Sequence, residues 1–362
     1  MSAYTIAVLP GDGVGPEVVA EALKVLLALE KPFPGLRLTF SEHPVGARCY
    51  TETGSDLPES TLEACRRADA ILFGSAGDPE VRFPDGTEIA PQITLRFLLD
   101  LYAGIRPIKK YPGVPPLLSG DPPIDYVIMR ENTEGLYASR GAGVRVGDDV
   151  AVDNMVITRT GTERIVCHAF EIALQRQGAP EDGKRRVTCV DKANILKSMA
   201  FFRQVYDRVA GDYPDIERDY AYVDAFTVYQ LRNPAFYDVV VAENMFGDII
   251  SDLAAATVGG MGMAPSADVG DRCGLFQPSH GTGPDIAGQG IANPVAQILS
   301  AGMMLTWLGE RHNEADAVAA AQTIDRAVAR TLTDPVNHTA DLGGRAATAA
   351  VGDAVVEAIQ KG

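Results

Sequence analysis

The sequence has few cysteines and no long apolar run. Its five cysteines are isolated and odd in number, and no Cys-x-x-Cys pair is present. We therefore expect neither a disulfide framework nor a structural zinc site, which fits a reducing cytoplasm. No apolar stretch reaches the roughly 20 residues of a membrane span. The first apolar run ends early, at Pro10-Gly11, so we expect no signal peptide.

Clustered positive charge is also scarce. The net charge is −16, and no basic run exceeds Lys184-Arg185-Arg186. Because phosphate contacts require grouped lysines and arginines, the composition argues against nucleic-acid binding. The Gly-Lys-Ser/Thr of a P-loop is absent as well, which argues against a metal-dependent phosphotransferase.

The 362 residues, 46% of them hydrophobic, are enough for two domains with substantial cores. Short apolar runs alternate with helix-like segments, which predicts α/β layers around a largely parallel sheet. The expected strands are residues 4–9, 70–73, 124–129 and 237–242. A helix should follow Pro16, with its apolar face formed by Val19, Leu23, Leu26 and Leu27.

Two acids follow the last of these strands. Asp248 and Asp252 are four residues apart, so on a helix both carboxylates lie on one face. Mg²⁺ or Mn²⁺ would relieve their repulsion, because hard cations take oxygen ligands. The alternative is a pair of solvated acids near a helix N-terminus. Asp224, at the end of another probable strand, could be a third ligand or an ordinary turn residue.

Positively charged residues occur at further element boundaries. Arg96, Arg106 and Arg130 would hold an anionic substrate if they converged, because guanidinium groups bind carboxylates through bidentate forks. They could equally form three separate surface salt bridges. Lys192 would be a usable base beside a metal and arginines, and otherwise an ordinary surface lysine.

Two glycine-rich segments are candidates for cofactor binding. Residues 11–15, GDGVG, follow the first strand but do not form GxGxxG, so they make a weak nucleotide signature. Residues 280–294 read HGTGPDIAGQGIANP, and their glycines would let the backbone wrap closely around a ligand. A plain surface loop is the alternative for this segment.

Taken together, these segments resemble the β-decarboxylating dehydrogenases, which act on 3-isopropylmalate, isocitrate, homoisocitrate, and tartrate or D-malate. The resemblance covers nearly the whole chain, with the motifs in family order. The matching pieces are LPGDGVGPEV, LRFLLDLYAGIRP, MRENTEGLY, VDKANIL, YVDA, FYDVVVAENMFGDIISDL, GGMGMAPSA and HGTGPDIAGQGIANP.

The resemblance implies a two-domain α/β/α fold that differs from the Rossmann fold. Residues 1–100 plus 255–362 would bind the cofactor, and residues 101–254 would bind substrate and metal and form the dimer. It also implies that NAD, a divalent metal and a small 2-hydroxy acid meet in active sites shared by a homodimer. Lys192 and Asp224 would reach each site from the partner subunit.

The resemblance further implies a role for each candidate residue. Arg96, Arg106 and Arg130 would bind the substrate carboxylates, and Asp224 would lie beside the substrate. Lys192 would be the general base, and Tyr137 the acid that protonates the enolate. The metal ligands would be Asp224, Asp248 and Asp252.

NAD rather than NADP is expected from the position of Asp285. A carboxylate accepts hydrogen bonds from ribose hydroxyls and would repel a 2′-phosphate. NADP-using relatives place a Lys-Tyr pair at Asp285-Ile286, and Asn293 would contact adenine. The remaining cofactor residues implied are Gly74, Ser75, Ala76 and Gly77 at the nicotinamide end, and His280, Gly281, Thr282 and Gly283.

The substrate side group stays open. Ala90 and Gln92 stand where isocitrate enzymes usually offer Ser and Asn. Ile89, Gln92 and Ile93 replace the Glu and two Leu of isopropylmalate enzymes. Isopropylmalate is the favoured family name, with tartrate or D-malate and isocitrate or homoisocitrate as alternatives. A non-catalytic regulatory subunit is the alternative from another class, although such subunits lose catalytic residues that this chain retains.

Overall fold

The apolar runs form the strands of two compact units of the computed structural model. The structure describes residues 2–361. Within them, unit 1 contains residues up to 101, 111–115, and those from 259 onward. Unit 2 contains residues 102–110 and 116–258. All four expected strands are present.

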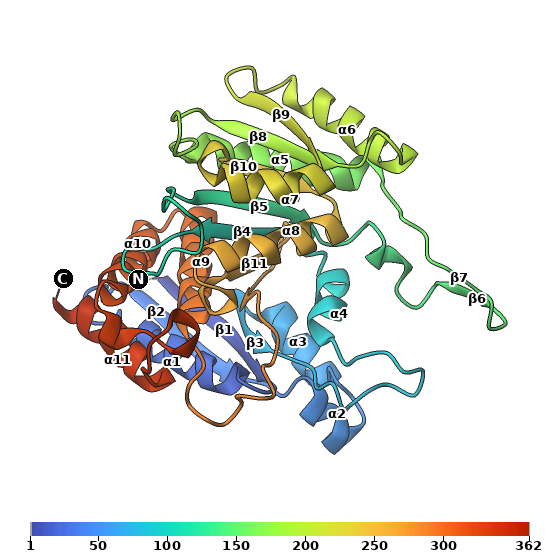
Figure 1. Cartoon of the computed structure of the whole chain (residues 1–362). Helices are drawn as coiled ribbons and strands as arrows, with labels where there is room; N and C mark the ends of the chain where they lie inside the picture. The colour runs from blue at the N-terminus through green and yellow to red at the C-terminus, as the bar shows by residue number, and fades with distance from the viewer. Residues whose placement is uncertain (1, 362) are drawn as a thin grey trace. The chain divides into compact units, whose positions relative to one another are not determined.

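The strands of unit 1 have the order β2-β1-β3-β12-β11, and Figure 1 labels β1, β2, β3 and β11 among them. Neighbouring strands are parallel except for the antiparallel pair β11 and β12. This order differs from the 3-2-1-4-5-6 order of the Rossmann fold, as expected. The strands are β1 (Ser2–Gly11), β2 (Leu36–Glu42), β3 (Ala70–Ser75), β11 (Pro265–Val269) and β12 (Gly274–Pro278).

Alternating side chains divide the core of unit 1 between the two faces of its sheet. Leu9 and Phe73 lie in one cluster with Leu62 and Cys65 of α3. On the other face, α9 contacts β3, β11 and β12 and also packs on α1 and α10. The helices of this unit are α1 (Gly15–Ala28), α2 (Ala47–Thr53), α3 (Glu59–Arg67), α4 (Pro91–Leu98), α9 (Val295–His312), α10 (Ala315–Leu332) and α11 (Thr348–Lys361).

Helix α1 begins next to Pro16 as predicted, but its buried face differs in part from the prediction. Val19 and Leu26 are buried, whereas Leu27 is 51% exposed and Leu23 is only partly buried. The buried row instead runs through Val18, Ala22, Val25 and Leu29. The helix packs against both α9 and α11, which places its contact stripe about one residue away from the expected one.

The strands of unit 2 have the order β4-β5-β10-β8-β9. Only β4 is antiparallel to its neighbour. Helices α7 and α8 supply the core on one face, and α5 and α6 pack on the other. The strands are β4 (Ala103–Lys109), β5 (Asp125–Glu131), β8 (Arg186–Asp191), β9 (Glu217–Tyr222) and β10 (Val239–Ala242). The helices are α5 (Arg159–Gln175), α6 (Lys197–Ala210), α7 (Val223–Arg232) and α8 (Asn244–Thr257).

A hairpin of unit 2 lies outside this sheet. Strands β6 (Val144–Val146) and β7 (Val150–Val152) pair with each other and stand away from the rest of unit 2 in Figure 1. Their four valine side chains are between 44% and 61% exposed.

The remaining short helical turns are Tyr137–Ser139, Pro234–Phe236, Met261–Met263, Pro335–Asn337 and Ala340–Leu342. None of the helices within residues 2–361 has the length and apolarity needed to span a bilayer.

Candidate active site

Helix α8 carries the two acids predicted to bind metal. It starts directly after β10, where the buried carboxylate of Glu243 accepts hydrogen bonds from the backbone N–H of Met245 (3.1 Å) and Phe246 (2.8 Å). This acidic N-cap fixes where the helix begins. Asp248 and Asp252 then follow one turn apart on the same face.

Two buried arginines lie behind these acids. The Nη1 atom of Arg106, on β4, is 3.0 Å from Oδ1 of Asp248 and 3.6 Å from Oδ1 of Asp252. It also donates to the hydroxyl of Ser251 at 2.6 Å. Arg130, at the end of β5, pairs with Asp248 through its own Nη1. The side chains of both arginines are at most 6% exposed, so their charges face the carboxylates and not bulk water.

Tyr137 completes the group. Its hydroxyl donates to Oδ2 of Asp248 at 3.1 Å, and the guanidinium carbon of Arg130 lies 5.4 Å from the centre of its ring. We call Arg106, Arg130, Tyr137, Asp248 and Asp252 the arginine–aspartate cluster. The structure therefore brings together five of the residues predicted for the active site, all within unit 2.

The electrostatics of this cluster suit an anionic ligand held through a cation. Its carboxylates are more exposed than its guanidinium groups, at 31% for Asp248 and 56% for Asp252. Burial raises the pKa of Asp252 above its ordinary value, although Arg106 acts in the opposite direction. Two carboxylates offset two guanidiniums, so an added divalent cation would leave the cluster positive and able to accept a dicarboxylate.

Lys192 and Asp224 form a second, separate pair. Lys192 lies between β8 and α6, and Asp224 lies in the first turn of α7. The Nζ and Oδ1 atoms are 2.5 Å apart, and the hydrogen bond from Lys192 holds the pKa of Asp224 below its ordinary value. Behind the lysine, buried Asp191 accepts bonds from Arg203 (2.7 and 2.9 Å) and fixes the start of the loop.

The three acids predicted as metal ligands do not form one cluster in a single chain. Within residues 2–361, no group of three or more His, Cys, Asp or Glu side chains is arranged to hold a metal ion. Asp248 and Asp252 supply two oxygen donors, and Asp224 is engaged with Lys192.

Arg96 belongs to unit 1 and has a different partner. Its Nε donates to Oδ2 of Asp268 at 2.9 Å, and the amide nitrogen of Gln277 donates to the same oxygen at 2.9 Å. Arg96 and Asp268 are both buried. Gln92, one turn earlier on α4, has a side-chain oxygen that is buried without a hydrogen-bond partner.

The two glycine-rich segments contact each other. The backbone N–H of Val14 donates to the carbonyl of Thr282 at 2.8 Å. A Cβ on Gly13 would lie only 2.0 Å from that carbonyl oxygen, and the residue has φ +59°, so glycine is required there. Glu17, in the first turn of α1, accepts from the N–H of Gly288 (2.5 Å) and Gly290 (3.0 Å). The first segment thus supports the second.

The predicted cofactor residues of unit 1 occupy two loops. Gly74 and Ser75 end β3, and Ala76 and Gly77 follow, with the N–H of Gly77 held at 2.8 Å by buried Asp12. The second loop contains His280, Gly281, Thr282, Gly283, Asp285, Ile286 and Asn293.

Within the second loop, Asp285 is exposed, whereas Ile286 packs against Val14 and Val18. Asn293 is buried, and both ends of its side chain are engaged inside the protein. It donates to Asp341 at 3.0 Å and accepts from the N–H of Val295 at 3.1 Å, at the start of α9.

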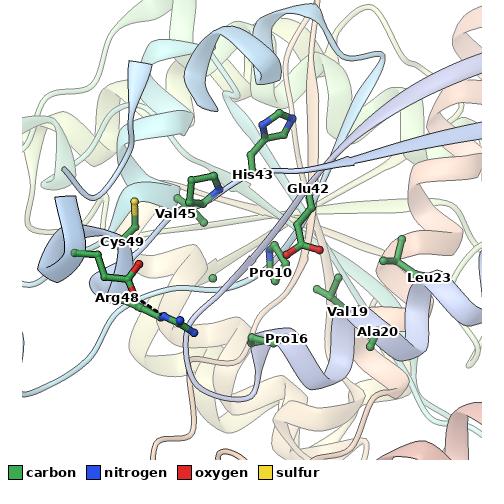
Figure 2. A pocket seen from close by; sticks show the side chains of 13 residues that line it. Pro10, Pro16, Val19, Ala20, Leu23, Glu42, His43, Val45, Arg48 and Cys49 are labelled. Atoms are coloured by element: carbon green, nitrogen blue, oxygen red, sulfur yellow. Dashed lines mark hydrogen bonds and ion pairs between the residues drawn. The ribbon is translucent and has the colours of Figure 1, made fainter. Parts of the chain in front are cut away.

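A pocket of about 500 Å³ lies beside α1 in unit 1. Figure 2 shows Val19, Ala20 and Leu23 on one side and Val45, Arg48 and Cys49 on the opposite side. Gly11 of the first glycine-rich segment lines this pocket, but none of the residues that the family resemblance assigns to NAD does.

Several residues that support the candidate site were not predicted from the sequence. Asn244 and Ser251 lie on the same helix as the two acids and contact the arginines. Their helical spacing from Asp248 was a usable signal. Glu17 and Asp12 lie in the LPGDGVGPEV motif, but the motif did not indicate that they act on loops far away along the chain.

Comparison with known proteins agrees with this architecture. A family model described as isocitrate/isopropylmalate dehydrogenase matches residues 5–355. The chain belongs to the isocitrate/isopropylmalate dehydrogenase family. The 3-isopropylmalate/3-methylmalate dehydrogenase of Methanocaldococcus jannaschii is 43% identical to it over 359 residues, covering 99% of each chain. The 3-isopropylmalate dehydrogenase of Rhodococcus jostii is 42% identical over 350 residues, covering 95% of this chain and 99% of the relative.

Solved structures of dehydrogenases have the same fold. The isocitrate dehydrogenase of Methylococcus capsulatus superposes with a TM-score of 0.86 at 36% identity, covering 99% of each chain. A β-decarboxylating dehydrogenase from Thermococcus kodakarensis gives a TM-score of 0.77 at 38% identity, covering 99% of this chain and 96% of that one. These relatives confirm the predicted family and the predicted α/β fold class.

Proposed function

We propose that the protein oxidises a malate-type 2-hydroxy acid with NAD and removes its β-carboxylate as carbon dioxide, using Mg²⁺ or Mn²⁺. The observation that carries this proposal is the arginine–aspartate cluster. In it, two buried guanidinium groups, a tyrosine hydroxyl and two carboxylates one helical turn apart meet at one point. Membership of a dehydrogenase family supplies the reaction class.

The donor set of α8 fits a hard divalent cation. Asp248 and Asp252 offer carboxylate oxygens, which Mg²⁺ and Mn²⁺ prefer, and their partial exposure leaves room for other ligands. Such an ion would supply positive charge that acidifies the C2 hydroxyl and stabilises the enolate. NAD would accept the hydride, and we assign its adenosine end to the loop from His280 to Asn293.

The chain's own residues divide the remaining work. Arg106 and Arg130 would bind the substrate carboxylates through their forks, with Arg96 as a third carboxylate ligand. Lys192 would remove the proton from the C2 hydroxyl. Tyr137 would protonate the enolate carbon after carbon dioxide leaves. Its hydroxyl already lies in a hydrogen bond to Asp248, next to the predicted metal.

We propose a homodimer in which Lys192 and Asp224 of one chain complete the cluster of the other. Within residues 2–361, Asp224 is paired with Lys192 and joins no acid cluster of its own chain, which supports a role at the site of a partner. Exposed apolar side chains offer a surface for self-association. They include the valines of the β6–β7 hairpin, Val228 and Tyr229 of α7, and Ile249 of α8.

For the substrate, a 3-alkylmalate such as 3-isopropylmalate is the first candidate, in line with the relatives at 42–43% identity. Tartrate or D-malate and isocitrate or homoisocitrate remain the alternative substrates, because Ala90, Gln92 and Ile93 match neither the residues usual in isocitrate enzymes nor those usual in isopropylmalate enzymes.

A substrate panel tests the proposal. Purified protein with Mn²⁺ and NAD should produce NADH absorbance with one member of a set containing 3-isopropylmalate, isocitrate, homoisocitrate, D-malate and tartrate. NADP should support little turnover. If no acid in the panel is turned over and the protein binds a small effector tightly, the hypothesis of a non-catalytic regulatory subunit would be favoured instead.

A further inference from the structure

We infer that Asn244 is a positioning residue that ties the substrate arginine to the segment carrying the catalytic tyrosine. Its amide lies between Arg130 and the backbone of Glu134, three residues before Tyr137. This inference rests on the proposed function, because it assigns Asn244 to the reaction that Arg130 and Tyr137 would perform.

The contacts of Asn244 are direct and buried. Its Oδ1 accepts from Nε of Arg130 at 3.0 Å and from Nη2 at 2.8 Å. Its Nδ2 donates to the carbonyl oxygen of Glu134 at 3.0 Å. Asn244 itself is fully buried and Arg130 is 1% exposed, so water does not substitute for these bonds.

An amide meets both demands from two separate atoms, with the oxygen accepting and the nitrogen donating. A guanidinium group donates hydrogen bonds and never accepts, whereas a backbone carbonyl accepts and never donates. The side chain between them must therefore present an acceptor on one side and a donor on the other. This requirement also fixes the orientation of the amide of Asn244, with its oxygen toward Arg130.

The packing around the amide leaves little freedom to rearrange. A Cβ on Gly135 would lie 2.4 Å from a carboxylate oxygen of Glu243 and 3.1 Å from Cβ of Asn244. A Cβ on Gly247 would lie 2.8 Å from Cβ of Arg130. The two glycines let the tyrosine segment, α8 and the arginine approach so closely that one amide spans the gap between them.

Two substitutions distinguish the hydrogen bonds of Asn244 to Arg130 from its hydrogen bond to Glu134. Asn244→Asp keeps an acceptor for Arg130 but faces the Glu134 carbonyl with a second acceptor. Asn244→Ala removes both contacts. Asn233→Asp is the matched control, because the Asn233 amide makes a single exposed hydrogen bond to Glu181 (3.0 Å) outside the cluster.

We expect Asn244→Asp to keep KM for the hydroxy acid within about 3-fold of wild type and to lower kcat about 10-fold, the effect of losing one buried hydrogen bond. The solvent deuterium isotope effect on kcat should rise, because a displaced Tyr137 slows the protonation step. Asn244→Ala should in addition raise KM about 10-fold. A loss of folded protein alone would lower kcat but leave the isotope effect unchanged, because the effect is a ratio within one preparation.

Amide hydrogen exchange across residues 133–139 provides a readout that needs no turnover. Exchange there should speed up in Asn244→Asp and stay at the wild-type rate in Asn233→Asp. Normal kcat and a normal isotope effect in Asn244→Asp, with an active wild type, would overturn the inference alone. A wild type that turns over none of the acids would refute the proposed function. Faster amide exchange in Asn244→Asp in that case would show that Asn244 has a structural role only.

Discussion

Glu17 gives the sharpest prediction about cofactor binding, because it fixes the proposed adenosine loop without belonging to it. Its two carboxylate oxygens accept from the N–H groups of Gly288 (2.5 Å) and Gly290 (3.0 Å). Glu17→Gln keeps one acceptor oxygen but turns an NH₂ group toward the other backbone N–H. The substitution also removes the negative charge that strengthens both bonds.

The size of the effect follows from these two bonds. Losing one hydrogen bond to a charged group costs about 2 kcal/mol. If NAD binding must restore the order of the loop, that cost appears as an increase of up to about 30-fold in the dissociation constant. The contact between Val14 and Thr282 stays in place, so the loop should remain attached at its other end.

Calorimetric titration of NAD without substrate measures this effect directly. Glu30→Gln is the control, since Glu30 is an exposed acid just beyond the end of the same helix. We expect Glu17→Gln to weaken binding by about 10- to 30-fold and Glu30→Gln to leave it unchanged. A dissociation constant within about twofold of wild type, in a Glu17→Gln protein with a normal thermal midpoint, would refute the reasoning.

Three other perturbations have definite expected results. Lys192→Met should abolish hydride transfer and leave the calorimetric NAD affinity nearly intact; weaker NAD binding would count against Lys192 as the base. Asp285→Lys combined with Ile286→Tyr should shift the ratio of kcat/KM values toward NADP, and an unchanged ratio would mean that the adenosine pocket lies elsewhere. Burial raises the pKa of Glu131 to about 7, from an ordinary value of about 4.5. The stability of wild type relative to Glu131→Gln should therefore fall as pH rises from about 4.5 to about 7. A difference in thermal midpoint between the two proteins that does not change with pH would contradict this.

The sequence predicted much of unit 2 because the relevant residues lie in continuous motifs. Asp248 and Asp252 are one helical turn apart on α8, and Arg130 follows directly from a strand of apolar residues. Hydrophobic periodicity locates such elements, and the polar residues at their ends then become candidates. The same helix contained Asn244 and Ser251, whose spacing from the acids could have marked them.

Contacts between distant segments could not be predicted in the same way. Glu17 and Gly288 are 271 positions apart, and nothing local to either residue signals the bond between them. Arg96 was predicted to bind substrate, but the sequence around it does not indicate that buried Asp268 is its partner. The prediction of the buried face of α1 was partly wrong for a similar reason. Helices α9 and α11, from the other end of the chain, determine which side of α1 is covered.

The arrangement of charges in the arginine–aspartate cluster suits a dicarboxylate that is bound through a metal ion. Its cations are buried and its anions are partly exposed. A site for an anion alone would not need Asp248 and Asp252, and a site for a cation alone would not need Arg106 and Arg130. Both sets are required if the ligand is an anion bound through a metal, which is the core of the proposed reaction.

Subunit complementation tests the shared site most directly. Lys192→Met and Asp248→Asn should each be inactive alone, because each damages every site of its own homodimer. After the two proteins are refolded together, a mixed dimer would combine intact Asp248 from one chain with intact Lys192 from the other in one of its two sites. Random pairing should then restore about a quarter of wild-type activity. If the mixture forms mixed dimers yet stays inactive, the active site does not draw on two chains and the account is contradicted.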